Sequence, residues 1–186
     1  MRDDRPIPAA VEAAPTLSSA ISREPASSVR RAHPTLWHGA LRRYLAPVAI
    51  GNLIWEFFQM PLYTIWWTGT WREIVFAAVH CTGGDLLIAL SSLTAALLLV
   101  GNGNWPEERF RAVAGLTILF GASYTVFSEW LNIVIRAAWA YSDLMPVIPM
   151  FGLEVGLSPL LQWLLIPTAA FLWVARWHRG MQSSPL

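Results

Sequence analysis

His80-Cys81-Thr82-Gly83-Gly84-Asp85 lies inside an apolar run that extends from Ile74 to Val100. About 20 residues at about 1.5 Å per residue cross the roughly 30 Å hydrocarbon core of a bilayer, so this run predicts a membrane-spanning helix. A charged group at the centre of such a helix costs roughly 2.5–3.5 kcal/mol on the insertion scale. We therefore expect His80 and Asp85 to face protein or water and to belong to a functional site. Gly83 and Gly84 predict a loosened helix and close backbone approach at this point.

The composition agrees with a membrane protein. Of the 186 residues, 55% are hydrophobic and only 13% are charged, which is atypical of a soluble domain. The single cysteine, Cys81, cannot form an internal disulfide. Eleven tryptophans predict aromatic belts at the two membrane interfaces.

Hydropathy and turn residues divide the chain into three parts. We expect a disordered cytosolic tail over residues 1–36, a membrane domain over 37–179 and a short cytosolic tail over 180–186. The predicted fold is all-α, an integral membrane four-helix bundle, with four spans at about 44–66, 74–100, 113–139 and 158–175. The connection before the fourth span is apolar for a loop and predicts a lid over the polar layer described below. Ser158-Pro159 predicts the start of the last helix.

Arginine placement predicts the orientation. If both termini are cytoplasmic, eleven of the thirteen arginines lie on the cytoplasmic side, and the exceptions are Arg72 and Arg136. The positive-inside rule favours this arrangement, and we expect a multi-pass protein of the bacterial inner membrane.

Helical rise places several polar side chains at one depth in the outer half of the membrane. They come from three spans, and their spacing of three or four residues puts those of the first and third spans on one face of each helix. The predicted catalytic residues are Glu56, His80 and Glu129, and the predicted binding residues are Asn52, Gln59, Asp85, Asn132 and Arg136. On an ideal second helix, His80 points about 140° from Asp85, so the two either serve different neighbours or the glycine pair distorts the helix.

Two kinds of chemistry suit this set. A histidine with two carboxylates can perform general acid–base catalysis, and His80, Glu56 and Glu129 are also candidate metal ligands. The polar residues can alternatively join the helices by hydrogen bonds, each worth about 0.6 kcal/mol in a membrane. No cofactor is identified, because the sequence contains no nucleotide-binding loop, no Cys-x-x-Cys pair and no Gly-x-Ser-x-Gly elbow. No dense basic cluster predicts nucleic-acid binding.

The leading functional hypothesis is an intramembrane site for a small amphiphilic or lipid-like molecule, with acid–base catalysis and simple binding both left open. One alternative is a proton- or metal-coupled carrier. Another is an accessory subunit that its polar residues hold in a larger membrane complex, or a homo-oligomer. Membrane lipid is the expected partner in each case.

Four strings resemble those of a family of small bacterial membrane proteins: HCTGGD (80–85), YTVFSEWLN (124–132), WAYSDLMP (139–146) and GLSPLLQW (156–163). The resemblance covers roughly residues 40 to 180 and excludes the N-terminal tail. It implies an inner-membrane location and carries no reaction and no residue roles.

Overall fold

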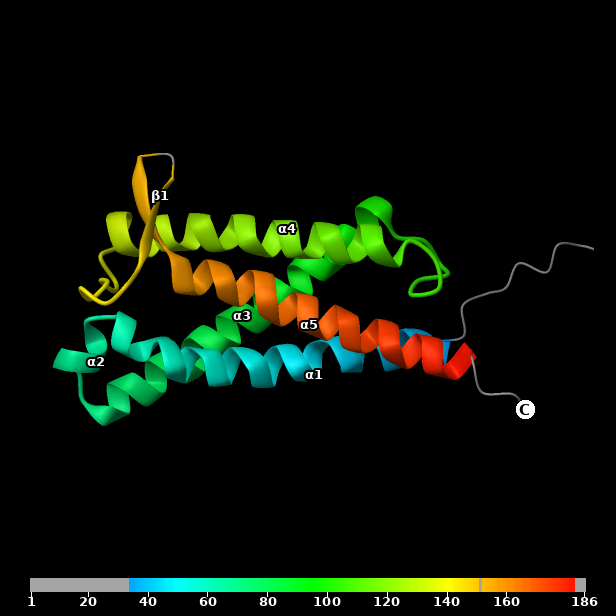
Figure 1. Ribbon diagram of the computed structural model, residues 1–186, viewed down its shortest axis with the longest axis horizontal. Helices are drawn as coiled ribbons and strands as arrows, with labels where there is room; N and C mark the ends of the chain where they lie inside the picture. Colours follow the sequence, from blue (N-terminus) through cyan, green and yellow to red (C-terminus); the bar gives the residue numbers. More distant parts are fainter. Residues whose placement is uncertain (1–33, 151, 183–186) are drawn as a thin grey trace, which may run out of the picture. The chain divides into compact units, whose positions relative to one another are not determined.

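Four long helices account for most of the computed structural model, which describes residues 34–150 and 152–182 (Figure 1). They are α1 (Pro34–Gln59), α3 (Trp71–Val100), α4 (Phe110–Glu129) and α5 (Leu157–Gln182). Shorter elements lie between them: η2 (Met60–Leu62), α2 (Ile65–Thr68), η3 (Trp130–Ile135), β1 (Val147–Met150) and β2 (Leu153–Gly156). The predicted helical class is thus confirmed.

Three segments of the described chain are long and apolar enough to cross a membrane: Trp71–Val100, Phe110–Ile135 and Leu157–Met181. Each is at least 25 residues long, and at about 1.5 Å per residue each exceeds the thickness of the hydrocarbon core. These helices indicate a membrane protein. Helix α1 does not belong to this set.

The long helices pack around a shared apolar core. Helix α1 lies against α3 and α5, and α4 lies against the same two helices. Fully buried core side chains come from all four, including Val48, Leu93, Val113 and Val174. At Gly121 on α4, an added Cβ would lie 2.2 Å from ring atoms of Trp163 on α5. This glycine is therefore required for the close approach of the two helices.

Two helix ends differ from the predicted spans. Helix α1 begins at Pro34 and ends at Gln59, so the predicted continuation to residue 66 is wrong. Pro61 lacks an N–H donor, and the chain passes through η2 into the extended backbone of Tyr63. The third predicted span ends at Ile135 instead of residue 139, because Ala137 is left-handed (φ 47°) and the Ala138 N–H donates to Asn132 O.

The other two ends lie closer to prediction. Helix α3 starts at Trp71, three residues before the predicted span, because Thr70 and Glu73 form a capping box. Helix α5 starts at Leu157, one residue early, and continues to Gln182 beyond the predicted residue 175. The predicted N-terminal tail up to residue 33, and residues 183–186, lie outside the described residues.

The apolar connection before α5 contains a β-hairpin that the sequence reading did not predict. Strands β1 and β2 pair antiparallel, with Val147 opposite Gly156 and Met150 opposite Leu153. The hairpin and α2 lie at the same end of the long helices (Figure 1). An isolated bridge between Tyr63 and Tyr141 joins the segment before α2 to the segment before the hairpin.

Candidate functional site

A buried polar network joins α1, α3 and α5. Gln59 Nε2 donates to Glu56 Oε1 over 2.9 Å on α1 and to Gln162 Oε1 over 3.2 Å on α5. Gln162 Nε2 in turn lies 2.9 Å from Asp85 Oδ2 on α3 and 3.0 Å from Glu56 Oε1. Glu56 and Gln162 are only 4% and 2% exposed. Three helices therefore converge on one set of carboxyl and amide groups.

Gln162 is the centre of this network. Its amide nitrogen has acceptors at Glu56, Asp85 and Asn52, the last at 3.0 Å from Nε2 to Oδ1. A side-chain NH₂ group carries two hydrogens, so three acceptors compete for two donors. A proton on the Glu56 or Asp85 carboxyl group would add a third donor.

The carboxyl groups of Glu56 and Asp85 are also neighbours, because one oxygen of each lies within 3.0 Å of the same Gln162 nitrogen. Two ionised carboxylates offer only acceptors to one another, so a proton on one of them would supply the missing donor. Two negative charges at this separation in an apolar interior would also repel strongly. The geometry therefore favours a proton on one of the two carboxyl groups.

Further side chains from α1 and α5 surround the pair. Ser158 Oγ donates to Gln59 Oε1 over 2.9 Å and accepts from Trp55 Nε1 over 3.1 Å. The Trp163 side chain lies near the Asp85 carboxyl group. Because Trp163 packs against Gly121, the α4–α5 contact positions this side chain.

Glu129 occupies a second polar cluster near the hairpin. Its carboxylate accepts a hydrogen bond from the Tyr141 hydroxyl, which itself accepts from the Gly156 N–H over 2.8 Å. The Tyr141 phenol thus connects the end of α4 to the end of β2. Tyr141 lies outside the long helices, and burial together with the Glu129 charge raises its pKa above the ordinary range.

The two clusters are neighbours. Glu129 and Glu56 are close enough to interact electrostatically, and the buried Tyr63 ring lies near both. The Tyr63 and Tyr141 rings pack with their centroids 5.7 Å apart. The structure thus joins Asn52, Glu56, Gln59 and Asp85 in one network through Gln162 and places Glu129 near it.

The remaining predicted site residues lie elsewhere. His80 is exposed on α3, with its ring stacked on Phe76 at a centroid distance of 5.5 Å. Asn132 is buried in η3, where its amide donates to Ser128 and its Oδ1 accepts from Arg136 over 3.3 Å. Arg136 is itself exposed. His80 and Arg136 therefore lie outside the buried network that contains Glu56 and Asp85.

The glycine pair beside Asp85 does not act as predicted. Helix α3 continues without interruption through Gly83 and Gly84, and a Cβ added at either would meet no atom within 4 Å. The prediction of a loosened helix and close backbone approach is wrong. His80 and Asp85 consequently keep their ideal helical separation and serve different neighbours, which was one of the two predicted alternatives.

The candidate metal ligands do not form a metal-binding site in the described residues either. Within residues 34–150 and 152–182, no three His, Cys, Asp or Glu side chains are grouped so as to hold a metal ion. His80 lies on the exposed side of α3, whereas Glu56 lies in the buried network. The described residues therefore do not bring the candidate metal ligands His80, Glu56 and Glu129 together.

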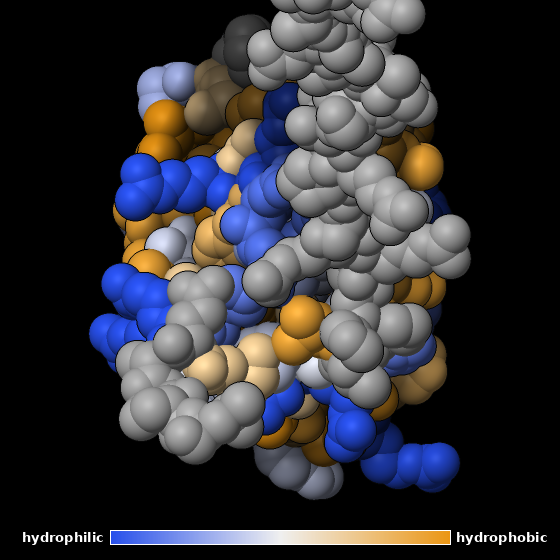
Figure 2. All heavy atoms as spheres, turned by 90° about the vertical axis from the view of Figure 1, so that its right-hand side faces the viewer, coloured by the Kyte–Doolittle hydropathy of each residue, from blue (hydrophilic) through white to orange (hydrophobic). Residues whose placement is uncertain are grey.

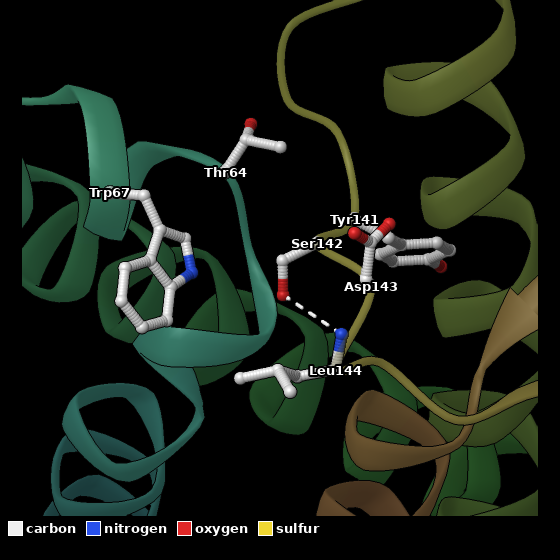
Figure 3. Close-up of a pocket in the computed structure, with 6 residues that line it drawn as sticks. All are labelled: Thr64, Trp67, Tyr141, Ser142, Asp143 and Leu144. Atoms are coloured by element: carbon white, nitrogen blue, oxygen red, sulfur yellow. Dashed lines mark hydrogen bonds between the residues drawn. The ribbon is translucent and has the colours of Figure 1, made fainter.

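Two open grooves lie on the surface at the end that carries α2. One is lined by Thr70, Arg72, Glu73 and Phe76 at the start of α3. The other, of about 500 Å³, lies between α2 and the segment before the hairpin and is lined by Thr64, Trp67, Tyr141, Ser142, Asp143 and Leu144 (Figure 3). Neither groove is lined by Glu56, Asp85 or Gln162.

Sequence reasoning missed four residues of the two clusters: Tyr141, Ser158, Gln162 and Trp163. Ser158 and Gln162 are four residues apart inside an apolar helix, and this spacing was the available signal for a shared polar face. From the sequence, Ser158 is predicted only as part of the start of the last helix. The contact of Tyr141 with Glu129 depends on the chain reversal after η3, for which the sequence offers no comparable signal.

Comparison of the chain with protein-family models, with curated proteins and with solved structures finds no match. The fold alone therefore indicates the class of protein. The chain is a mostly helical protein with three helices able to cross a membrane, which is consistent with a membrane protein.

Proposed function

We propose that the chain is a four-span protein of the bacterial inner membrane that binds a small amphiphilic molecule at the Glu56–Asp85 pair and exchanges a proton with it. The observation that carries this proposal is the convergence of the two carboxyl groups on Gln162 Nε2, which lies 3.0 Å from Glu56 Oε1 and 2.9 Å from Asp85 Oδ2. Ionisable groups in a membrane domain are costly and are functional candidates by default. A pair with one proton holds both an acid and a base, which are the two groups that proton exchange requires.

A fourth span by α1 is supported by its length and packing. Its 26 residues extend about 39 Å at about 1.5 Å per residue, and it lies against both α3 and α5. The polar residues of its second half are buried, whereas Ile50, Ile54 and Phe58 are exposed apolar side chains suited to lipid. The polar groups that lower the average hydropathy of α1 would thus be shielded from the bilayer.

The residues at one end of the long helices support a cytoplasmic position for both termini. This end faces the viewer in Figure 2. The start of α1, the α3–α4 connection and the end of α5 lie at this end in Figure 1. Hydrophilic residues gather there among hydrophobic ones (Figure 2). The arginines of these segments are Arg42, Arg43, Arg109, Arg111, Arg176 and Arg179, and the positive-inside rule favours a cytoplasmic position for them.

Lipid extraction from the purified full chain tests the proposed binding. Mass spectrometry of the extract should show an amphiphile enriched over bulk lipid with the wild-type chain and depleted with Glu56→Gln and Asp85→Asn. His80→Gln is the matched control, because His80 is exposed outside the network. The same lipid profile in all four proteins would contradict the proposal.

A proton-coupled carrier is the second candidate. The observation in its favour is that the network is closed by its own side chains and that neither described groove is lined by the pair. A proton needs no cavity, whereas an amphiphile requires the network to open. Vesicles of phosphatidylethanolamine and phosphatidylglycerol with an internal pH dye would show proton flux for a carrier, and that flux would be lost in Glu56→Gln.

A further inference from the structure

The groove in Figure 3 combines an aromatic wall with an acidic side chain. The Trp67 indole borders it on the α2 side, and Tyr141 to Leu144 border it on the other. The Asp143 side chain lies on the side opposite Trp67 (Figure 3). Both residues are exposed, so an incoming molecule can reach them.

Most polar groups of the groove already have partners within the protein. The Thr64 hydroxyl donates to Ala140 O over 3.3 Å, and the Ser142 hydroxyl donates to Pro61 O over 2.9 Å. The Trp67 indole N–H also donates to Pro61 O, over 3.1 Å. These groups hold the groove together and are not free to bind a ligand.

The Tyr141 hydroxyl is likewise occupied, by Glu129 and the Gly156 N–H. Asp143 differs from all of these residues. Within the described part of the chain its carboxylate has neither an ion-pair nor a hydrogen-bond partner, and no arginine, lysine or histidine lines the groove. The groove therefore contains one unpaired negative charge, on the side opposite the Trp67 indole.

We propose that this groove binds the ammonium group of a small amphiphile, with the charge paired to Asp143 and covered by the Trp67 ring. Ammonium groups bind favourably over the face of tryptophan, and a carboxylate supplies the complementary charge. The groove shares no residue with the Glu56–Asp85 network. Binding in the groove can therefore fail or succeed independently of the proposed function.

The test is calorimetric titration of the full chain in dodecyl maltoside with dihexanoylphosphatidylcholine. Trp67→Leu should weaken binding about 2- to 30-fold, the range expected for a cation over an aromatic ring. Asp143→Asn should also weaken binding, and its effect should shrink at about 1 M salt, where the screening length is about 3 Å.

Two matched controls share the chemistry but lie outside the groove. Trp71→Leu removes an exposed tryptophan, 65% exposed against 62% for Trp67, and Glu154→Gln removes an exposed carboxylate of β2. Both should bind as the wild type does. A loss in the controls equal to that in Trp67→Leu and Asp143→Asn would overturn the proposal.

Two further titrations distinguish the source of the ammonium group. Choline chloride that binds as well as the lipid identifies a soluble ammonium ligand, and tighter binding of the lipid identifies a lipid headgroup; both results support the site. Dihexanoylphosphatidylglycerol, which lacks the ammonium group, should not bind in the groove. Equal binding of this lipid, or no binding of either ammonium compound, would overturn the proposal.

Discussion

Gln162 Nε2 on α5 donates to Glu56 Oε1 on α1 over 3.0 Å, and this contact joins helices that are 106 residues apart in the chain. The same nitrogen also reaches Asp85 on α3. One amide thus positions both carboxyl groups of the proposed proton-sharing pair. The packing of three helices and the geometry of the site consequently depend on the same side chain.

Replacement of Gln162 by leucine should destabilise the protein. The change removes the donor to Glu56, Asp85 and Asn52, and each buried acceptor left unpaired costs about 1–3 kcal/mol. Unfolding in mixed micelles with increasing denaturing detergent measures the loss. Ser91→Ala is the control, since the exposed Ser91 hydroxyl bonds only within its own helix. A Gln162→Leu protein as stable as Ser91→Ala would show that the network contributes nothing to folding.

Gly121→Ala should disturb the α4–α5 contact and, through Trp163, the site. The added methyl group would overlap the Trp163 ring, and overpacking of a well-packed core costs about 1–3 kcal/mol. Gly115→Ala on the same helix is the matched control, because an added Cβ there meets nothing within 4 Å. Thermal unfolding in detergent should separate the two variants. Equal melting temperatures would contradict the described packing.

Tyr141→Phe should reduce the sensitivity of the protein to alkali. The pKa of Tyr141 is raised in the folded protein, so the folded state keeps its proton when the unfolded chain begins to lose it near pH 10. This stabilisation is fully present below pH 10 and decreases as the pH rises further. Melting temperatures from pH 8 to pH 11 should therefore fall less steeply for Tyr141→Phe than for the wild type. Parallel slopes would indicate that Tyr141 ionises normally.

His80→Leu should leave stability within about 0.5 kcal/mol of the wild type, as is usual for exposed positions without special contacts. The ring of His80 stacks on Phe76 and has no role in the Glu56–Asp85 network. The same unfolding assay in mixed micelles checks this expectation. A loss comparable to that of Gln162→Leu would mean that His80 is buried among polar partners, as the sequence first predicted.

Hydropathy was sufficient to predict the helical class and the approximate position of all four long helices. The spacing of Asn52, Glu56 and Gln59 also predicted correctly that one face of the first helix is polar and buried. Helix ends were predicted less well, because Pro61 and the left-handed Ala137 end two helices earlier than apolar composition alone indicates.

The site was only partly predictable because depth along a helix does not determine which way a side chain faces. His80 lies near the predicted depth but on the exposed side of α3. The sequence does not predict the role of Gln162, because a single glutamine in an apolar helix has many structural explanations. Its central position becomes apparent only when α5 packs against α1 and α3.

The central claim is that Glu56 and Asp85 share one proton, and infrared spectroscopy of the full chain in lipid tests it most directly. At neutral pH the wild type should show a protonated carboxyl C=O band that shifts or disappears in both Glu56→Gln and Asp85→Asn, and that persists in the exposed control Glu73→Gln. A spectrum in which neither variant alters any protonated carboxyl band would contradict the account.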